Sequence, residues 1–231
     1  VYVNYSIKKF SLTDNDIKGE LMTNVLMPGA FLPGDEGMPD LPGSGKFIAI
    51  PTGAEVEVNI LSSRTETIQN IDIAPSPRIP LDTDKGPLFY EKDQKVYSKN
   101  AYYPAKPVQV GMRTKIRGVE VVMLGITPWQ YNPVTKELIV YHDLKVELSI
   151  TGGNGYGDLR YRSPWWEDVL KSSVLNYESL PEAGYAYRNG SGTRTPDLDY
   201  IIITPDDPVF TAWADTIALF RNKQGIKTGV V

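Results

Sequence analysis

The sequence predicts a mainly β protein: an antiparallel β-sandwich or barrel-like domain, followed by the first strand–helix–strand unit of an α/β domain. Two observations support this prediction. Up to residue 150, nearly every regular signal is that of a strand, and several of these segments alternate with a period of two, which is typical of strands that bury one face. Beyond residue 197, a continuous apolar run precedes apolar residues three and four positions apart, which indicates a fully buried strand and then a helix.

The β-rich domain is expected to span residues 1–187. Residues 28–45 and 71–107 are dense in proline or glycine, so we expect loops and extended chain there, because proline cannot donate a backbone hydrogen bond. The alternating set Val3, Tyr5 and Ile7 suits a first strand. The later strand signals are Lys46–Ile50, Glu55–Ile60, Val119–Ile126, Glu137–Tyr141 and Leu144–Ile150. Residues 164–180 have helical spacing, with Pro164 suited to the first turn.

A polar linker is expected at residues 188–197, and the α/β unit at residues 198–231. The run Tyr200–Thr204 predicts a strand buried on both faces. Asp206-Asp207-Pro208 supplies a capping acid and a proline suited to a helix start, and Gly225 suits the helix end. One such unit cannot bury both faces of its sheet, so we expect the rest of the domain beyond Val231 or on a second chain.

Composition excludes several kinds of function. The net charge is −4, so no basic surplus indicates nucleic-acid binding. The 231 residues include no Cys and one His, which excludes a disulfide framework, a Cys-based zinc site and a complete Cys–His dyad. No apolar run approaches the ~18 residues of a membrane helix. The chain starts at Val1 without a basic or apolar leader, so we expect that any signal peptide is removed or not included.

The remaining candidate residues have structural interpretations that we favour. His142, beside Asp143, is interpreted as a turn residue, because no Gly-x-Ser-x-Gly motif accompanies it. The acidic groups in loops are interpreted as solvated turn or capping residues, since none matches a calcium loop. The paired aromatics are expected to pack in the core. These acidic and aromatic residues are Asp35, Glu36, Asp82, Asp84, Asp206, Asp207, Tyr102, Tyr103, Trp165 and Trp166.

Three basic residues alternate just before the strand at Val119. Arg113, Lys115 and Arg117 would project from one side of an extended segment. Such a row could meet an acidic pocket or lie in water, and the spacing alone favours water.

A longer motif follows the same strand. Ile116–Ile126 leads through Thr127-Pro128-Trp129 to Gln-Tyr-Asn-Pro-x-Thr at residues 130–135, and then to the apolar strand at Glu137–Tyr141. This pattern closely resembles the propeptides of the gingipain family. Pro51-x-Gly53 and residues 71–75 also resemble that propeptide, and the resemblance covers about residues 40–180. Residues 198–231 are similar to the start of the family's caspase-like catalytic domain.

The resemblance implies an exported cysteine endopeptidase made as a zymogen, secreted or at the cell surface. Its prodomain would act as folding chaperone and inhibitor. A prodomain arginine that enters the specificity pocket in arginine-specific members matches Arg117, with Arg113 and Lys115 as alternatives. Arg188 and Arg194 in the linker would be processing sites.

The partner that the resemblance implies is the remainder of the catalytic domain, on the same or a second chain. No catalytic residue, metal site or cofactor is expected within these residues. Calcium binding is left open for the rest of the catalytic domain. The alternative interpretation is an extracellular β-sandwich that binds a saccharide or protein, attached to an unrelated α/β domain.

Overall fold

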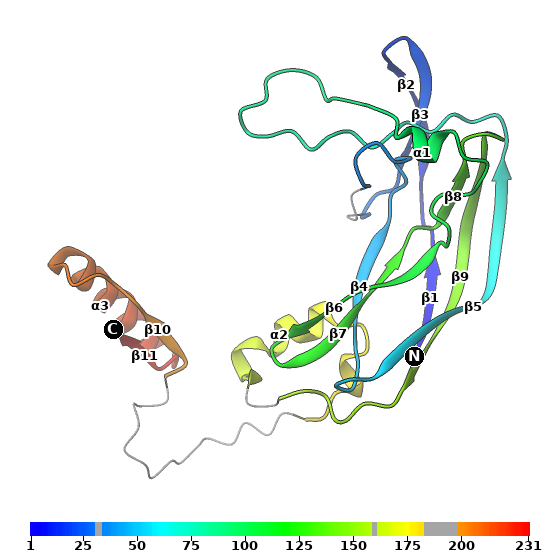
Figure 1. The fold of residues 1–231 in the computed structure, drawn as a ribbon. Helices are drawn as coiled ribbons and strands as arrows, with labels where there is room; N and C mark the ends of the chain where they lie inside the picture. Colours follow the sequence, from blue (N-terminus) through cyan, green and yellow to red (C-terminus); the bar gives the residue numbers. More distant parts are fainter. Residues whose placement is uncertain (31–33, 159–160, 183–197) are drawn as a thin grey trace. The chain divides into compact units, whose positions relative to one another are not determined.

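The computed structural model describes residues 1–30, 34–158, 161–182 and 198–231 (Figure 1). The chain divides into two compact units, Val1–Ala183 and Gly184–Val231, and each is described by itself. Candidate processing residues Arg188 and Arg194 lie outside the described residues, as does the whole predicted linker.

The first unit contains an antiparallel sheet built around one long strand. Strand β9 (Glu137–Thr151) pairs on one side with β5 (Glu55–Ile68) along most of its length. On its other side, β9 pairs first with β8 (Trp129–Asn132) and then with β1 (Tyr2–Ser6). The predicted strands at residues 137–141 and 144–150 are therefore one continuous strand.

A second antiparallel sheet packs against the first. Its order is β4-β7-β6, and its strands are β4 (Ser44–Ala49), β7 (Val119–Ile126) and β6 (Val108–Ile116). Ile48, Val122 and Leu124 from this sheet share one buried cluster with Val146 and Leu148 of β9. Facing sheets that share a core form a sandwich, so the predicted mainly β sandwich is confirmed.

A short helical layer covers the outer face of the second sheet. It consists of α2 (Pro164–Ser173) and the 3₁₀ turn η2 (Tyr177–Ser179), where the sequence predicted one helix over 164–180. Leu170 and Val174 pack against Val119 and Val121 of β7. The side chain of Asn176 bonds both the N–H and the C=O of Ala49, at 2.7 and 2.9 Å, and so covers the edge of β4.

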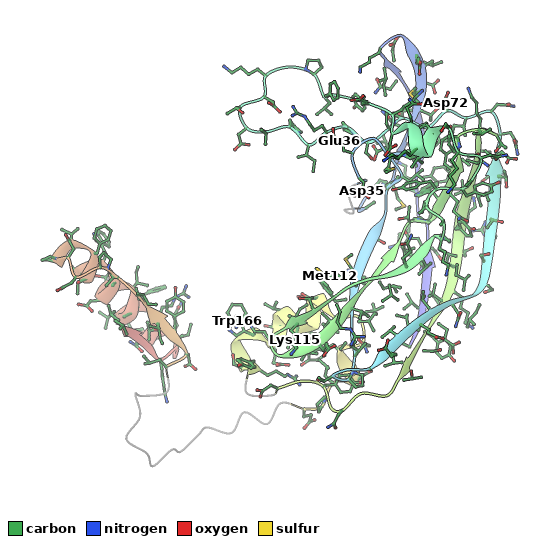
Figure 2. All side chains as sticks on the ribbon, in the orientation of Figure 1. Asp35, Glu36, Asp72, Met112, Lys115 and Trp166 are labelled. Carbon is green, nitrogen blue, oxygen red and sulfur yellow. The ribbon has the colours of Figure 1, made fainter. Side chains whose placement is uncertain are left out.

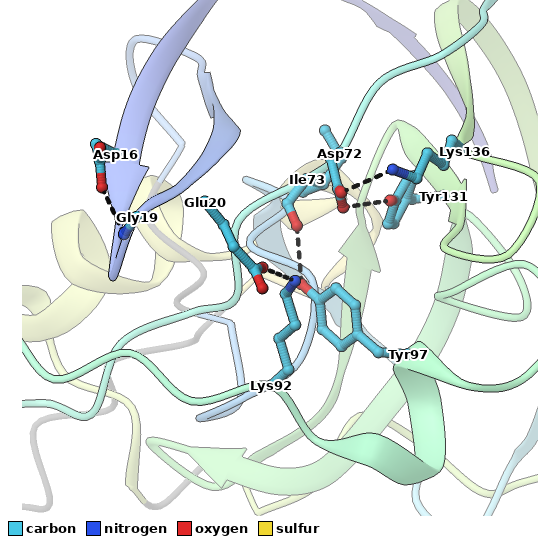
Figure 3. A network of polar contacts seen from close by, with 9 residues as sticks. All are labelled: Asp16, Gly19, Glu20, Asp72, Ile73, Lys92, Tyr97, Tyr131 and Lys136. Carbon is cyan, nitrogen blue, oxygen red and sulfur yellow. Dashed lines mark hydrogen bonds and ion pairs between the residues drawn. The ribbon is translucent and has the colours of Figure 1, made fainter.

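The hairpin of β2 (Ser11–Ile17) and β3 (Glu20–Leu26) closes one end of the unit, together with the short helix α1 (Gln94–Tyr97). Figure 3 shows the polar contacts beneath it. The hydroxyl of Tyr97 donates to the carbonyl of Ile73 at 3.0 Å, and that of Tyr131 donates to Asp72 at 3.3 Å. Burial raises the pKa of both Tyr97 and Tyr131, so both remain neutral donors.

His142 corrects the sequence interpretation, because it lies inside β9 rather than in a turn. The pairing with β5 shifts here: Arg64 lies opposite Asp143, whereas Thr65 lies opposite Tyr141. His142 is therefore the extra residue of a β-bulge, which explains why the apolar alternation is interrupted at this point. Its Nε2 lies 2.8 Å from Glu66 Oε2.

The second unit is the predicted strand–helix–strand. Its elements are β10 (Tyr200–Ile202), α3 (Pro208–Lys223) and β11 (Thr228–Val230), and the two strands are parallel. The Asp207 side chain accepts a hydrogen bond from the N–H of Val209 at 2.9 Å, and Gly225 follows the helix with φ +82°. Both fit the predicted caps. No helix in the described part of the chain is long and apolar enough to cross a membrane.

Candidate functional site

The β6–β7 hairpin ends in a two-residue turn at Arg117 and Gly118. Ile116 and Val119 form the last strand pair, so Arg117 lies at the tip rather than in the strand. Both turn residues have positive φ, +48° and +79°. A tight hairpin turn with the right-handed twist of its strands requires positive φ at both positions, and glycine adopts it without steric cost. The hairpin therefore fixes the backbone position of Arg117.

A neighbouring segment supports this tip. The N–H of Asp158 donates to the carbonyl of Gly118 at 3.2 Å. A Cβ atom at Gly118 would lie 2.5 Å from the carbonyl oxygen of Asp158, and one at Gly157 would overlap the carbonyl of Gly118. Glycine at both positions allows the two backbones to approach, and this approach restricts movement of the tip.

The side chain of Arg117 stacks on an aromatic ring. Its guanidinium carbon lies 3.5 Å from the ring centroid of Trp166, which is in the first turn of α2. Trp166 is 42% exposed, so the predicted core packing is wrong for this residue. Figure 2 labels Trp166 at this end of the hairpin. The guanidinium is thus a solvent-accessible cation held by a cation–π contact.

The side chain of Arg113 has a structural role. Its Nη1 lies 2.9 Å from Oε1 of the buried Glu120, and its Nη2 donates to the carbonyl of Ala54 at 2.6 Å. Glu120 lies within the sandwich, where an unpaired carboxylate would be costly. Arg113 neutralises that charge and ties β6 to the start of β5.

Lys115 is exposed and lies directly opposite Glu120 in the β6–β7 register. It makes no hydrogen bond or ion pair with any described residue. Arg113 and Lys115 share one face of β6, whereas Arg117 leaves the strand and lies over α2. The expected single row of three cations is therefore not formed, because the turn begins before the third one.

A buried ion pair stabilises the position of α2, the helix that carries Trp166. The Nε and Nη2 of Arg162 contact the two carboxylate oxygens of Glu167 at 2.9 and 2.6 Å. Tyr177 also donates to Glu167 at 2.6 Å, and Arg162 Nη1 donates to the carbonyl of Pro181 at 2.5 Å. We call these four residues the α2 clasp. It joins α2 to the segment that leads out of the first unit.

The motif Gln130–Thr135 has a structural role in this unit. All of Trp129–Asn132 is buried. Gln130 donates to the carbonyls of Pro104 and Ala105, and Asn132 Oδ1 accepts from the N–H groups of Val134 and Thr135. These bonds fix the proline-rich segment and the β8–β9 turn.

Asp84 has a local structural role, as Asp207 has at the start of α3. Asp84 Oδ2 accepts from Arg78 at 2.8 Å and from the N–H of Leu81 at 3.0 Å, closing its own loop. Residues 1–30, 34–158, 161–182 and 198–231 contain no group of three or more His, Cys, Asp or Glu side chains that could hold a metal ion.

Known proteins share this sequence pattern and fold. The Propeptide_C25 family model matches residues 1–183, and the chain belongs to this family. It is 29% identical over 197 residues to Lys-gingipain of Porphyromonas gingivalis, covering 80% of this chain and 11% of that protein. It is 32% identical over 149 residues to Gingipain R1 of the same organism, covering 62% and 15%. The chain thus spans about a tenth of the length of the first curated relatives.

Two solved structures have a similar fold. A complex of the pro- and mature domains of Porphyromonas gingivalis RgpB matches with a TM-score of 0.67 and 22% identity, over 76% of this chain and 92% of that chain. A structure that describes zymogenic latency of gingipain K from the same organism matches with a TM-score of 0.54 and 28% identity, over 66% and 87%.

The tip geometry predicts unequal effects of two glycine substitutions. Gly19 and Gly118 have similar φ, +85° and +79°, but only Gly118 has backbone atoms close to a new Cβ. Gly19→Ala should lower the free energy of unfolding by about 1–2 kcal/mol, from the left-handed conformation alone. Gly118→Ala should lose more, because the segment at Asp158 must move. Urea unfolding measures both, and equal losses would contradict the described contact.

The α2 clasp predicts a larger loss. Glu167→Gln removes the carboxylate charge that pairs with the buried Arg162, so we expect the free energy of unfolding to fall by about 3–5 kcal/mol. Glu20→Gln is the control, since Glu20 forms an exposed ion pair with Lys92 and should lose no more than about 1 kcal/mol. Denaturant unfolding of the two variants tests this difference. Similar small losses would show that the clasp is not a buried charge pair.

Proposed function

We propose that the β-rich domain, residues 1–187, is the inhibitory prodomain and folding chaperone of a secreted gingipain-like cysteine endopeptidase zymogen. Residues 188–197 are then the linker, and residues 198–231 begin the caspase-like catalytic domain. Membership of the Propeptide_C25 family and the gingipain relatives support this proposal. The titles of the two related structures describe a prodomain–mature domain complex and zymogenic latency for those proteins.

The observation that carries the proposal is the exposed guanidinium of Arg117 at a rigid hairpin tip. A protruding tip can enter a cleft, and a guanidinium can pair with a pocket carboxylate through two parallel hydrogen bonds. Arg113 is less suited to this role, because its guanidinium is already bound to Glu120 and to the carbonyl of Ala54. Lys115 is the remaining alternative, since it is exposed and without a partner among the described residues.

The exposed apolar side chains of the second unit support the proposal that this unit packs against further parts of a catalytic domain. Phe210, Trp213 and Phe220 of α3 are each more than half exposed, and Ile203 is 85% exposed. The three aromatic residues recur at helical spacing along α3, and a contiguous apolar surface marks an interface. Their partner in this proposal is the remainder of the catalytic domain, which also supplies the catalytic Cys and His. Any calcium site would belong to that remainder.

Inhibition in trans tests the role of Arg117. The 231-residue chain is added to the mature catalytic domain of the same precursor, and the inhibition constant is measured. Arg117→Ala should weaken inhibition at least tenfold, because truncating one partner of a buried charge pair costs about 2–5 kcal/mol. Lys115→Ala is the matched control, and its inhibition constant should stay within about twofold.

The opposite pattern, a loss with Lys115→Ala and none with Arg117→Ala, would transfer the role to Lys115. No inhibition by the unsubstituted chain would refute the inhibitory prodomain and favour the binding-module alternative.

Processing of the precursor is a separate prediction. We expect self-cleavage after Arg188 or Arg194, if the peptidase prefers basic residues. Intact mass spectrometry of the purified precursor over time should show fragments that end at these residues. A variant without the catalytic Cys should remain uncut. Identical fragments in both samples would show cleavage by another peptidase.

A further inference from the structure

The contact between Arg117 and Trp166 has a consequence for the proposed inhibition. The guanidinium carbon lies 3.5 Å from the ring centroid, so the charged group lies over a residue of its own domain. In the proposed complex the same group pairs with a carboxylate in another domain. One guanidinium at the end of one side chain cannot occupy both positions at once.

The backbone on both sides of this contact is fixed, so the side chain of Arg117 must make the change. The hairpin turn is closed by the Ile116–Val119 pair and supported by Asp158. Helix α2 is fixed by the burial of Leu170 and by the α2 clasp. Rotation about the side-chain bonds of Arg117 requires neither element to move, and such rotation is fast at an exposed position.

We propose that Trp166 is a positioning residue that holds Arg117 on the prodomain surface until the specificity pocket replaces the ring. This inference rests on the proposed function. The free domain is divided between a state stacked on Trp166 and a released state that can dock. The observed affinity is reduced by the fraction of released molecules. Trp166 therefore weakens inhibition, and the affinity is set partly within the prodomain.

The first experiment detects the stacked state in the free 231-residue chain by NMR. A guanidinium above an indole ring lies in the ring current, so the Nε–H proton of Arg117 should resonate upfield of the other arginines. Arg117→Lys removes this signal and so assigns it. Trp166→Leu keeps an apolar side chain without a π face, and should return the signal to the ordinary range. An Arg117 signal that Trp166→Leu leaves unchanged would overturn the inference.

The second experiment measures inhibition of the mature catalytic domain by the same variants. Trp166→Leu should strengthen inhibition about two- to fivefold, the range expected when an exposed cation–π contact no longer competes. Trp166→Phe keeps an aromatic face and should stay closer to the unsubstituted chain. In the Arg117→Ala background, Trp166→Leu should have no effect, because the cation is already absent.

The two proposals fail in different ways. If Arg117→Ala weakens inhibition but Trp166→Leu weakens it too or leaves it unchanged, the positioning role is wrong and the proposed function stands. If Arg117→Ala leaves inhibition unchanged, both proposals fail for this residue. If Trp166→Leu has the same effect with and without Arg117, Trp166 acts directly on the partner and the positioning role is again wrong. Circular dichroism confirms that each variant is folded.

Discussion

Burial of β7 on both faces is the constraint on which the first unit depends. Residues Val122 and Leu124 face the core shared with β9, whereas Val119 and Val121 face α2. One strand therefore joins the two sheets of the sandwich to the helical layer. A strand with two buried faces tolerates little variation in register, because a one-residue shift would exchange its faces. The position of the hairpin tip depends on this fixed register.

The hairpin tip that carries Arg117 is built from small backbone features. Gly118 and Gly157 allow the backbone of the hairpin and the backbone at Gly157 and Asp158 to approach closely. The cation is thus carried on a rigid backbone, and its side chain is held only by the contact with Trp166. Sites built on rigid elements hold their geometry with less loss of entropy on binding than sites on long loops.

Much of this fold could be predicted from the sequence, and the exceptions have physical causes. The apolar residues of β7 and the apolar run at β10 indicated their strands directly. Strand β6 gave no clear signal, because Gly111 and Met112 together lie opposite Met123 in a bulge. Val110 and Ile116 consequently face different buried clusters, although a strict period of two assigns them to one face. The interruption at His142 has the same kind of cause.

The candidate site was less accessible to sequence reasoning. Spacing placed Arg113, Lys115 and Arg117 together, and only the resemblance distinguished Arg117. The pairing of Arg113 with Glu120 depends on a cross-strand diagonal, which requires the register. The stacking of Arg117 on Trp166 joins two residues that are far apart in the sequence, and no periodic pattern connects them. A turn signal was nevertheless present, since glycine after Arg117 suits a two-residue hairpin.

In the proposed zymogen, the α2 clasp also bears on what happens to the prodomain after the linker is cut. The carbonyl of Pro181 is bound by Arg162, and the described contacts of the tip and the α2 clasp all lie at or before Pro181. In the proposed zymogen, cutting the linker therefore leaves these described contacts in place. Cleavage removes only the covalent tether, which converts a high effective concentration into ordinary dissociation and dilution. The severed prodomain is then a product inhibitor, and the onset of activity depends on precursor concentration as well as on the rate of cutting.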